Sequence, residues 1–257
     1  MATVASVIVA LDFDGVLCDS ARETAFSAWR AGRELWPEWT TTEPPPEYVA
    51  RFLQVRPWLE TGHQAVTMMR MVADGLADAE FADHLEEHCR EYQAQLGCGR
   101  EDMVTCFGRA RDEWIRRDLA GWLGSHDFYP GVTAAVRRAR ELLDVYVLTT
   151  KQERFARALL ESQGVYLPED RLYGLERGRS KEDILEELGR GEGCSEVHFV
   201  EDRAETLRRV LAVPALSAVR LYYAAWGYGT PADLVWAQAE PRVRVWGLAE
   251  FLELDAP

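Results

Sequence analysis

The sequence has little of the chemistry that cross-links secreted proteins. Its 257 residues contain five cysteines and no Cys-x-x-Cys pair, and an odd number of cysteines cannot all pair within one chain. Both observations argue against a closed disulfide framework and favour a reducing compartment, so we expect a cytoplasmic protein. The first apolar run is about ten residues long, lacks a basic segment before it and ends at Asp12, which predicts neither a signal peptide nor a membrane span.

Positive charge is also scarce. The chain has 29 Lys and Arg against 43 Asp and Glu, a net charge of −14, and no stretch in which Lys and Arg cluster. We therefore expect neither nucleic acid nor an anionic membrane as a partner. Hydrophobic residues make up 47% and charged residues 28% of the chain, which is ordinary for a globular protein. The length allows one large domain or two modest ones.

A short β-branched segment lies near the start of the chain, where residues 7–11 read VIVAL. A continuous apolar run of this length is typical of a strand that is covered on both faces in a parallel sheet. The aspartates Asp12 and Asp14 follow it directly. Because ligands of parallel sheets bind just beyond the carboxyl ends of the strands, we expect both carboxylates to lie where a ligand binds.

The hydrophobic period changes along the chain. Strand and helix patterns alternate in the C-terminal half, which together with residues 7–11 predicts an α/β fold with a parallel sheet. Between residues 47 and 122, apolar residues recur only three or four apart, as in helices. We therefore expect one domain from residues 1–19 plus 128–257, and an all-helical domain from residues 20–127 that acts as a lid over the aspartates.

The helix expected from about residue 20 begins with capping chemistry. Asp19 or Ser20 can serve as its N-cap, and Glu23 follows Ser20 by three residues. This spacing predicts a capping box, in which the N-cap and the glutamate satisfy the free backbone amides of the first turn.

Further polar residues follow the later expected strands. Thr149 and Thr150 end one strand, Glu201 and Asp202 end another, and Lys181 begins a helix. Taken singly, each has an ordinary explanation as a turn former, a structural hydroxyl or a solvated charge. Their common position at or after strand ends indicates a functional site instead.

Such a set of groups suits phosphoryl transfer. A carboxylate can attack phosphorus and carry the group as an acyl phosphate, while further carboxylates hold Mg²⁺, which prefers hard oxygen ligands. A hydroxyl and an ammonium group can bind the equatorial oxygens, over which transition-state charge spreads. A second carboxylate can protonate the leaving oxygen and then deprotonate the attacking water.

Four motifs resemble, in order, those of the haloacid dehalogenase superfamily, whose members are mostly phosphatases: DFDGVLCDS, VYVLTT, SKEDIL and VHFVEDRAET. The resemblance implies a modified Rossmann-like core with a helical C1-type cap between the first and second motifs. The strings RPWLETG and TTKQ further resemble those of uncharacterised members from cyanobacteria and plants. The implied function is Mg²⁺-dependent hydrolysis of a small phosphorylated metabolite, such as a sugar phosphate, through an aspartyl phosphate.

The resemblance also implies roles for single residues. Asp12 becomes the nucleophile and Asp14 the general acid and base, while Thr149 and Lys181 hold the phosphoryl oxygens. We prefer Lys181 to Lys151 as the catalytic lysine because it opens a helix, as the family's third motif does. The expected metal ligands are Asp12, the backbone carbonyl of Asp14, Asp202, and Glu201 as ligand or orienter. The expected substrate contacts are Gly15, Thr150, Lys151, Arg56, Glu60 and His63.

Alternatives from two other classes stay open. A phosphomutase of the β-phosphoglucomutase type keeps the whole set, whereas Asp14 argues against a dehalogenase or a phosphonatase. A non-catalytic phosphate-binding regulatory protein on the same scaffold is the third possibility, since fold does not establish function. Glu205 lies near the position of a further acid of the family but at a different spacing, so its role is open.

Two segments have both a functional and a structural interpretation. VRPWLETGH, residues 55–63, contains Arg56, Glu60 and His63, and is either a substrate-selecting loop of the cap or a plain connector. YYAAWGYG, residues 222–229, is rich in aromatic residues and glycine. It either walls the active site or closes the core.

Overall fold

The computed structural model describes residues 6–191 and 193–254. The chain forms two compact units, one of residues 1–19 with 128–257 and one of residues 20–127. The first unit contains a parallel sheet, and the second is built from helices. Short strands β2 (Cys18–Asp19) and β3 (Asp127–Phe128) pair with each other where the chain leaves and re-enters the first unit.

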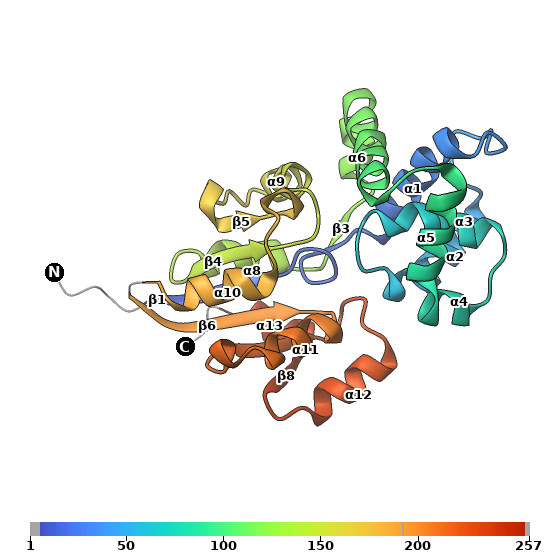
Figure 1. Ribbon diagram of the computed structural model, residues 1–257. Coiled ribbons are helices and arrows are strands. Elements are labelled where there is room, and N and C mark those ends of the chain that lie inside the picture. The colour runs from blue at the N-terminus through green and yellow to red at the C-terminus, as the bar shows by residue number, and fades with distance from the viewer. Residues whose placement is uncertain (1–5, 192, 255–257) are drawn as a thin grey trace. The chain divides into compact units, whose positions relative to one another are not determined.

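The first unit is built on a six-stranded sheet in the order β5-β4-β1-β6-β7-β8, with every neighbouring pair parallel. Its strands, in that order, are β5 (Leu172–Tyr173), β4 (Asp144–Leu148), β1 (Ser6–Leu11), β6 (Cys194–Glu201), β7 (Arg220–Ala224) and β8 (Val243–Trp246). This sheet, with helices around it, confirms the expected α/β class (Figure 1).

The register brings three strand ends to one edge of the sheet. Leu11, the last residue of β1, pairs with Val147 of β4 and with Val200 of β6. Both partners lie one residue before the end of their own strand. The residues that follow β1, β4 and β6 therefore lie next to one another, as the carboxyl ends of parallel strands do.

Helices cover the sheet because its central strand is apolar on both faces. Ile8 and Ala10 of β1 belong to one buried cluster with Leu185 and Leu207 from two covering helices, while the alternate residue Val9 is buried away from that cluster. The helices of this unit are α8 (Val132–Ala139), α9 (Glu153–Ser162), α10 (Lys181–Gly189), α11 (Ala204–Ala212), α12 (Pro231–Ala239) and α13 (Leu248–Leu252).

The second unit packs around its first helix. Its helices are α1 (Ala21–Leu35), α2 (Pro46–Val55), α3 (Gln64–Ala73), α4 (Asp78–Asp83), α5 (Leu85–Leu96), α6 (Arg100–Arg117) and α7 (Leu119–Leu123). Helix α1 contacts α2, α3 and α6. Trp29 of α1 stacks on Trp39 with ring centroids 4.3 Å apart, within a core that also holds Met68, Met69 and Met71 of α3. The tryptophans and methionines named here serve packing.

Glu23 has a different partner from the one that its position predicts. The N-cap Ser20 makes no side-chain capping bond, so the predicted capping box is wrong. The Glu23 carboxylate is fully buried and accepts hydrogen bonds from Arg111 Nε at 2.8 Å and Nη2 at 2.6 Å. Trp122 Nε1 donates to it as well, at 3.3 Å. A buried charge needs such partners, and this one ties α1 to α6.

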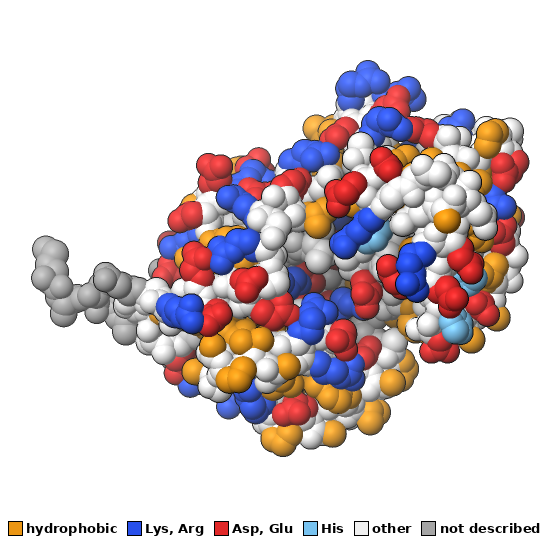
Figure 2. Space-filling view, in the orientation of Figure 1, with side chains coloured by type: hydrophobic (Ala, Val, Ile, Leu, Met, Phe, Trp, Pro, Cys, Tyr) orange, Lys and Arg blue, Asp and Glu red, His pale blue; other side chains and the backbone are white. Residues whose placement is uncertain are grey.

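Acidic and basic side chains are interspersed over the face of the molecule drawn in Figure 2, with no patch of Lys and Arg alone. Charged side chains pair in several places, as Arg209 does with Glu182 at 2.8 Å and Arg220 with Glu196 at 2.6 Å. Exposed pairs of this kind contribute little to stability. Among the residues that the structure describes, no helix combines the length and the apolar character that crossing a membrane requires.

Candidate active site

Asp12 lies at the centre of the carboxyl edge of the sheet. It follows the last residue of β1, and its backbone N–H donates to the carbonyl of Val200 at 3.0 Å, which continues the pairing with β6. Its side chain is buried, with 6% of the residue exposed. The strand thus delivers this carboxylate to a fixed place, as its sequence predicted.

Lys181 joins two carboxylates across this edge. Its ammonium Nζ lies 2.8 Å from Asp12 Oδ1 and 2.7 Å from Glu201 Oε2. Ser180, the N-cap of α10, accepts a hydrogen bond from the backbone N–H of Asp183 and so holds the start of the helix that carries Lys181. Helix α10 therefore places the lysine of the SKEDIL motif directly on the candidate nucleophile.

Lys151 serves a different carboxylate. Its ammonium lies 3.2 Å from Asp14 Oδ1, and the residue is almost fully buried. Lys181, the lysine expected to be catalytic, thus pairs with Asp12, whereas Lys151 pairs with Asp14. The substrate contact expected of Lys151 stays a prediction, and the contact that the structure shows is the one to Asp14.

Both carboxylate oxygens of Glu201 are already engaged. Oε2 accepts from Lys181, and Oε1 accepts from the backbone N–H groups of Asp202 and Arg203, each at 3.1 Å. The side chain is fully buried at the end of β6. This geometry favours Glu201 as the residue that orients Lys181, one of the two roles expected for it.

Burial and like charge shift the acid–base properties of the site. Burial, and next the neighbouring Glu201 carboxylate, raise the pKa of Asp12 to about 7, although Lys181 acts in the opposite direction. Burial by itself lowers the pKa of Lys181, but the carboxylates of Asp12 and Glu201 outweigh it and raise that pKa above its ordinary value. The like charge of these neighbouring carboxylates favours binding of a cation.

Three buried carboxylates could hold that cation. Asp12, Glu201 and Asp202 each offer an oxygen, and these oxygens lie within 4.8 Å of one another. A set of buried carboxylates of this kind matches the hard oxygen ligands that Mg²⁺ takes in proteins. The residues present therefore fit a magnesium site.

Two neighbouring glycines make room for Asp202. Gly15 has a φ of +90°, and a Cβ at this position would lie 2.0 Å from Asp202 Oδ2. A Cβ at Gly227 would lie 2.3 Å from the Cβ of Asp202. Only glycine fits at either place, and at Gly15 the backbone conformation requires it as well. The substrate contact expected of Gly15 stays a prediction, and what the structure shows is its packing against Asp202 of the fourth motif.

The second motif supplies one buried hydroxyl. Thr149 follows β4 and is buried, and its backbone N–H donates to Tyr173 O at 2.9 Å. Its Oγ1 accepts from the backbone N–H of Lys151 at 3.0 Å, whereas Thr150 is exposed. Glu205, whose role was open, lies exposed on α11 and pairs with Arg208 at 3.5 Å.

The candidate substrate loop belongs to the second unit and is largely buried there. Arg56 begins a short 3₁₀ helix (Arg56–Trp58), has 8% of its surface exposed and donates from Nη1 to Leu59 O at 3.1 Å. His63 is equally buried, with Nδ1 2.8 Å from Thr61 Oγ1, and Glu60 is exposed. Their contacts within this unit describe a well-packed turn, and their role toward a substrate stays a prediction.

His63 makes the stability of this unit depend on pH. Burial, and next the nearby Arg100, lower the pKa of His63 to about 4, whereas an unfolded histidine titrates near pH 6.5. The unfolded state therefore takes up the proton first, so stability is full above about pH 6.5 and falls as the pH drops toward 4. We expect the urea midpoint to fall less between pH 7.5 and 5 in His63→Asn than in the wild type.

The matched control for this prediction is His84→Asn, because the His84 side chain is half exposed. It should leave the pH dependence of the urea midpoint as in the wild type. An equal fall in the wild type and in His63→Asn would contradict the role given to His63.

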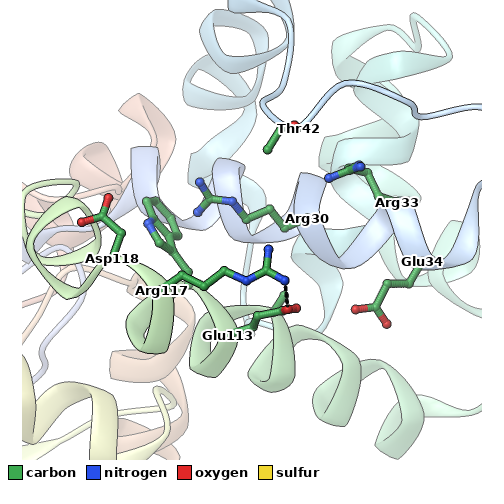
Figure 3. Close-up of a pocket in the computed structure, with 9 residues that line it drawn as sticks. Arg30, Arg33, Glu34, Thr42, Glu113, Arg117 and Asp118 are labelled. Carbon is green, nitrogen blue, oxygen red and sulfur yellow. Dashed lines mark hydrogen bonds and ion pairs between the residues drawn. The ribbon is translucent and has the colours of Figure 1, made fainter.

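A separate pocket of about 480 Å³ lies within the second unit, between α1 and α6 (Figure 3). Its charged lining consists of Arg30, Arg33, Arg117, Glu34, Glu113 and Asp118, equal numbers of each sign. Arg117 pairs with Glu113, and the Arg30 guanidinium stacks 3.5 Å from the Trp114 ring centroid. No residue expected in the active site lines this pocket, so it enters no step of the chemistry below.

Comparison with known proteins agrees with this geometry. The family model described as haloacid dehalogenase-like hydrolase matches residues 7–208. Similar solved structures include a predicted phosphoglycolate phosphatase from Haemophilus somnus, 16% identical over 99% of both chains with a TM-score of 0.59. A predicted phosphatase from Clostridium acetobutylicum is 15% identical over 97% of both chains, with a TM-score of 0.54.

A third similar structure carries a different activity in its name. Protein Tyrosine Kinase A of Mycobacterium tuberculosis is 16% identical over 97% of both chains, with a TM-score of 0.53. At such identities these likenesses show a shared fold. The comparison with curated proteins found no match.

Proposed function

This chain belongs to the haloacid dehalogenase-like hydrolases, and from that premise we propose that it hydrolyses a small phosphomonoester with Mg²⁺, through a phosphoryl group carried on Asp12. The observation that carries the proposal is the environment of Asp12. Its carboxylate touches Lys181 and lies within one cluster of buried oxygens with Glu201 and Asp202. This arrangement combines a nucleophile, a fixed positive charge and ligands for a hard cation.

In the first step, a carboxylate oxygen of Asp12 attacks phosphorus. The new P–O bond forms as the bond from phosphorus to the leaving oxygen breaks, and Asp14 gives its proton to that oxygen. In the second step, water attacks phosphorus and passes its proton to Asp14. The bond between phosphorus and Asp12 breaks, which releases phosphate and restores both aspartates.

The remaining residues hold charge in place. The Lys181 ammonium, fixed between Asp12 and Glu201, stays charged and stabilises negative charge on the phosphoryl oxygens, as fixed charges in a buried site do. Thr149 Oγ1 lies at the same edge of the sheet and can donate to the phosphoryl group. Asp12 and Asp202 would hold Mg²⁺, with the carbonyl of Asp14. When bound, the cation offsets the repulsion between the anionic nucleophile and the anionic substrate.

The part of the substrate other than its phosphoryl group must be recognised by residues outside the sheet edge. The residues at the sheet edge treat all phosphomonoesters alike, because they act on the phosphoryl group and the cation. We propose that residues 20–127 form the cap and that Arg56, Glu60 and His63 contribute to selection, using binding energy remote from the reacting bond. We further propose that the protein acts in the cytoplasm. Its five cysteines form no Cys-x-x-Cys pair, which favours a reducing compartment.

Phosphate release tests the proposal. We expect the purified protein to release phosphate from a panel of phosphomonoesters in the presence of Mg²⁺, and to stop when EDTA is added. A phosphomutase would convert a sugar phosphate into its isomer, because it returns the phosphoryl group to the sugar. Following free phosphate and sugar isomers in the same reaction separates the two, and isomer without phosphate would overturn the proposed hydrolysis. No turnover of any substrate would favour a phosphate-binding regulatory protein.

A further inference from the structure

The segment of residues 225–229 lies against the fourth motif. It follows β7 and reads AWGYG, with Trp226 before Gly227 and Tyr228 between Gly227 and Gly229. A Cβ at Gly227 would lie 2.5 Å from the carbonyl oxygen of Gly15, and one at Gly229 would lie 1.6 Å from the Tyr223 hydroxyl. The backbone of this segment therefore approaches its neighbours more closely than any residue with a side chain would allow.

Tyr228 hydrogen-bonds to two carboxylates that lie far apart in the sequence. Its backbone N–H donates to Asp202 Oδ2 at 2.7 Å, and its hydroxyl donates to Asp19 Oδ1 at 2.7 Å. Hydrogen bonds to ionised acceptors are among the stronger ones in proteins. Tyr228 thus links Asp202, which follows β6, to Asp19, after which the chain continues into residues 20–127.

Trp226 makes a second link to the same stretch of chain. Its indole Nε1 donates to the carbonyl of Val16 at 3.0 Å, and its ring lies 5.4 Å from that of Phe251 in α13. The Phe251 side chain is fully buried, so the indole is anchored in the core of the first unit. Residues 13–19, which carry Asp14, are therefore held at two points by residues 225–229.

We propose that Tyr228 is a positioning residue that couples cation binding at Asp202 to the order of residues 13–19. The inference rests on the proposed function, because it takes Asp202 as a ligand of Mg²⁺. The backbone bond fixes the orientation of the Asp202 carboxylate before the cation arrives, as the partners of metal ligands generally do. The hydroxyl bond extends that constraint to Asp19. Coupling of this kind is reciprocal, so cation binding also orders residues 13–19.

Tyr228→Phe separates the two bonds of this residue. The variant loses the hydroxyl that reaches Asp19 and keeps the backbone N–H that reaches Asp202. Hydrogen exchange is measured on the full chain, with and without Mg²⁺ and without substrate. In the wild type, we expect Mg²⁺ to slow exchange in both residues 13–19 and residues 225–229. In Tyr228→Phe, the slowing in residues 225–229 should stay, whereas the slowing in residues 13–19 should fall to the part that direct contact of Mg²⁺ with the Asp14 carbonyl supplies.

Titration with Mg²⁺ alone gives an independent readout. We expect Tyr228→Phe to bind Mg²⁺ about 2- to 10-fold more weakly than the wild type, the scale of one lost hydrogen bond. The matched control is Tyr166→Phe, because Tyr166 is one of the exposed aromatic residues. The control should bind Mg²⁺ and respond in exchange as the wild type does.

The two proposals fail in different ways. If the wild type binds Mg²⁺ and Tyr228→Phe keeps both the affinity and the protection of residues 13–19, the coupling through Tyr228 is overturned while the metal site stands. If the wild type binds no Mg²⁺, the metal site of the proposed function and this inference are both overturned. Tyr228→Phe could also exchange faster overall because it is less stable. Such a rise is present without Mg²⁺ and cancels, because the measured quantity is the change in exchange that Mg²⁺ causes in each segment.

Discussion

Asp12→Asn is expected to lower kcat by on the order of 10⁴- to 10⁶-fold, the range found when a catalytic nucleophile is removed. An amide cannot form the acyl phosphate, whereas the carboxylate of Asp12 lies at the end of β1 with Lys181 2.8 Å away. The fold should survive, because Lys181 keeps its contact with Glu201 at 2.7 Å and no buried ammonium is left without a partner. Phosphate release at saturating substrate measures the loss, and circular dichroism checks the fold.

Asp144→Asn is the matched control for this prediction. Asp144 lies at the amino end of β4, where it pairs with Arg171 at 2.6 Å, so it sits on the same sheet at the edge opposite the site. It should keep wild-type kcat. Beryllium fluoride, which mimics a phosphoryl group on a carboxylate, should bind to the wild type and to the control but not to Asp12→Asn in ¹⁹F NMR. If Asp12→Asn retained turnover, Asp12 would be excluded as the nucleophile.

Lys181→Met is expected to lower kcat about 10²- to 10³-fold, the effect of losing one group that stabilises transition-state charge. The loss should be the same for an aryl and for an alkyl phosphate, because Lys181 acts on the nucleophile and the phosphoryl group. Removing this ammonium also leaves the Asp12 and Glu201 carboxylates facing each other, which raises the pKa of Asp12 further. Since Asp12 must be ionised to attack, the acid limb of the pH profile should move to higher pH.

Lys151→Met is the matched comparison, because Lys151 is the second lysine at this edge of the sheet and touches Asp14 instead. In the proposed mechanism Asp14 protonates the leaving oxygen, and an aryl oxide needs that proton much less than an alkoxide does. Lys151→Met should therefore slow the alkyl phosphate more than the aryl phosphate. The roles given to the two lysines would be contradicted by either of two results. One is a loss of kcat in Lys181→Met that differs between the aryl and the alkyl phosphate. The other is a loss in Lys151→Met that is the same for both.

Local sequence patterns were enough to predict the fold class and the strand ends. The β-branched run of residues 7–11 and the later alternation of strand and helix patterns depend on local hydrophobic periodicity, which neighbouring residues carry whatever the rest of the chain does. Parallel strands place their carboxyl ends at one edge. For that reason Asp12, Thr149 and Asp202 could be expected near one another before the structure was known, and the parallel sheet confirms the class.

Which side chains touch depends on contacts between residues that lie far apart in the sequence. The resemblance favoured Lys181 over Lys151 as the catalytic lysine, but the pairing of Lys181 with Asp12 and of Lys151 with Asp14 depends on where α10 and the turn after β4 meet β1. The capping box expected of Glu23 did not form, because a buried partner on α6, 88 residues away, binds both of its oxygens. Likewise, aromatic and glycine content drew attention to residues 222–229, but not to the bonds that Tyr228 makes to Asp202 and Asp19. Local propensity is set by adjacent residues, whereas the pairing of buried charges is set by what the completed fold brings within hydrogen-bond reach.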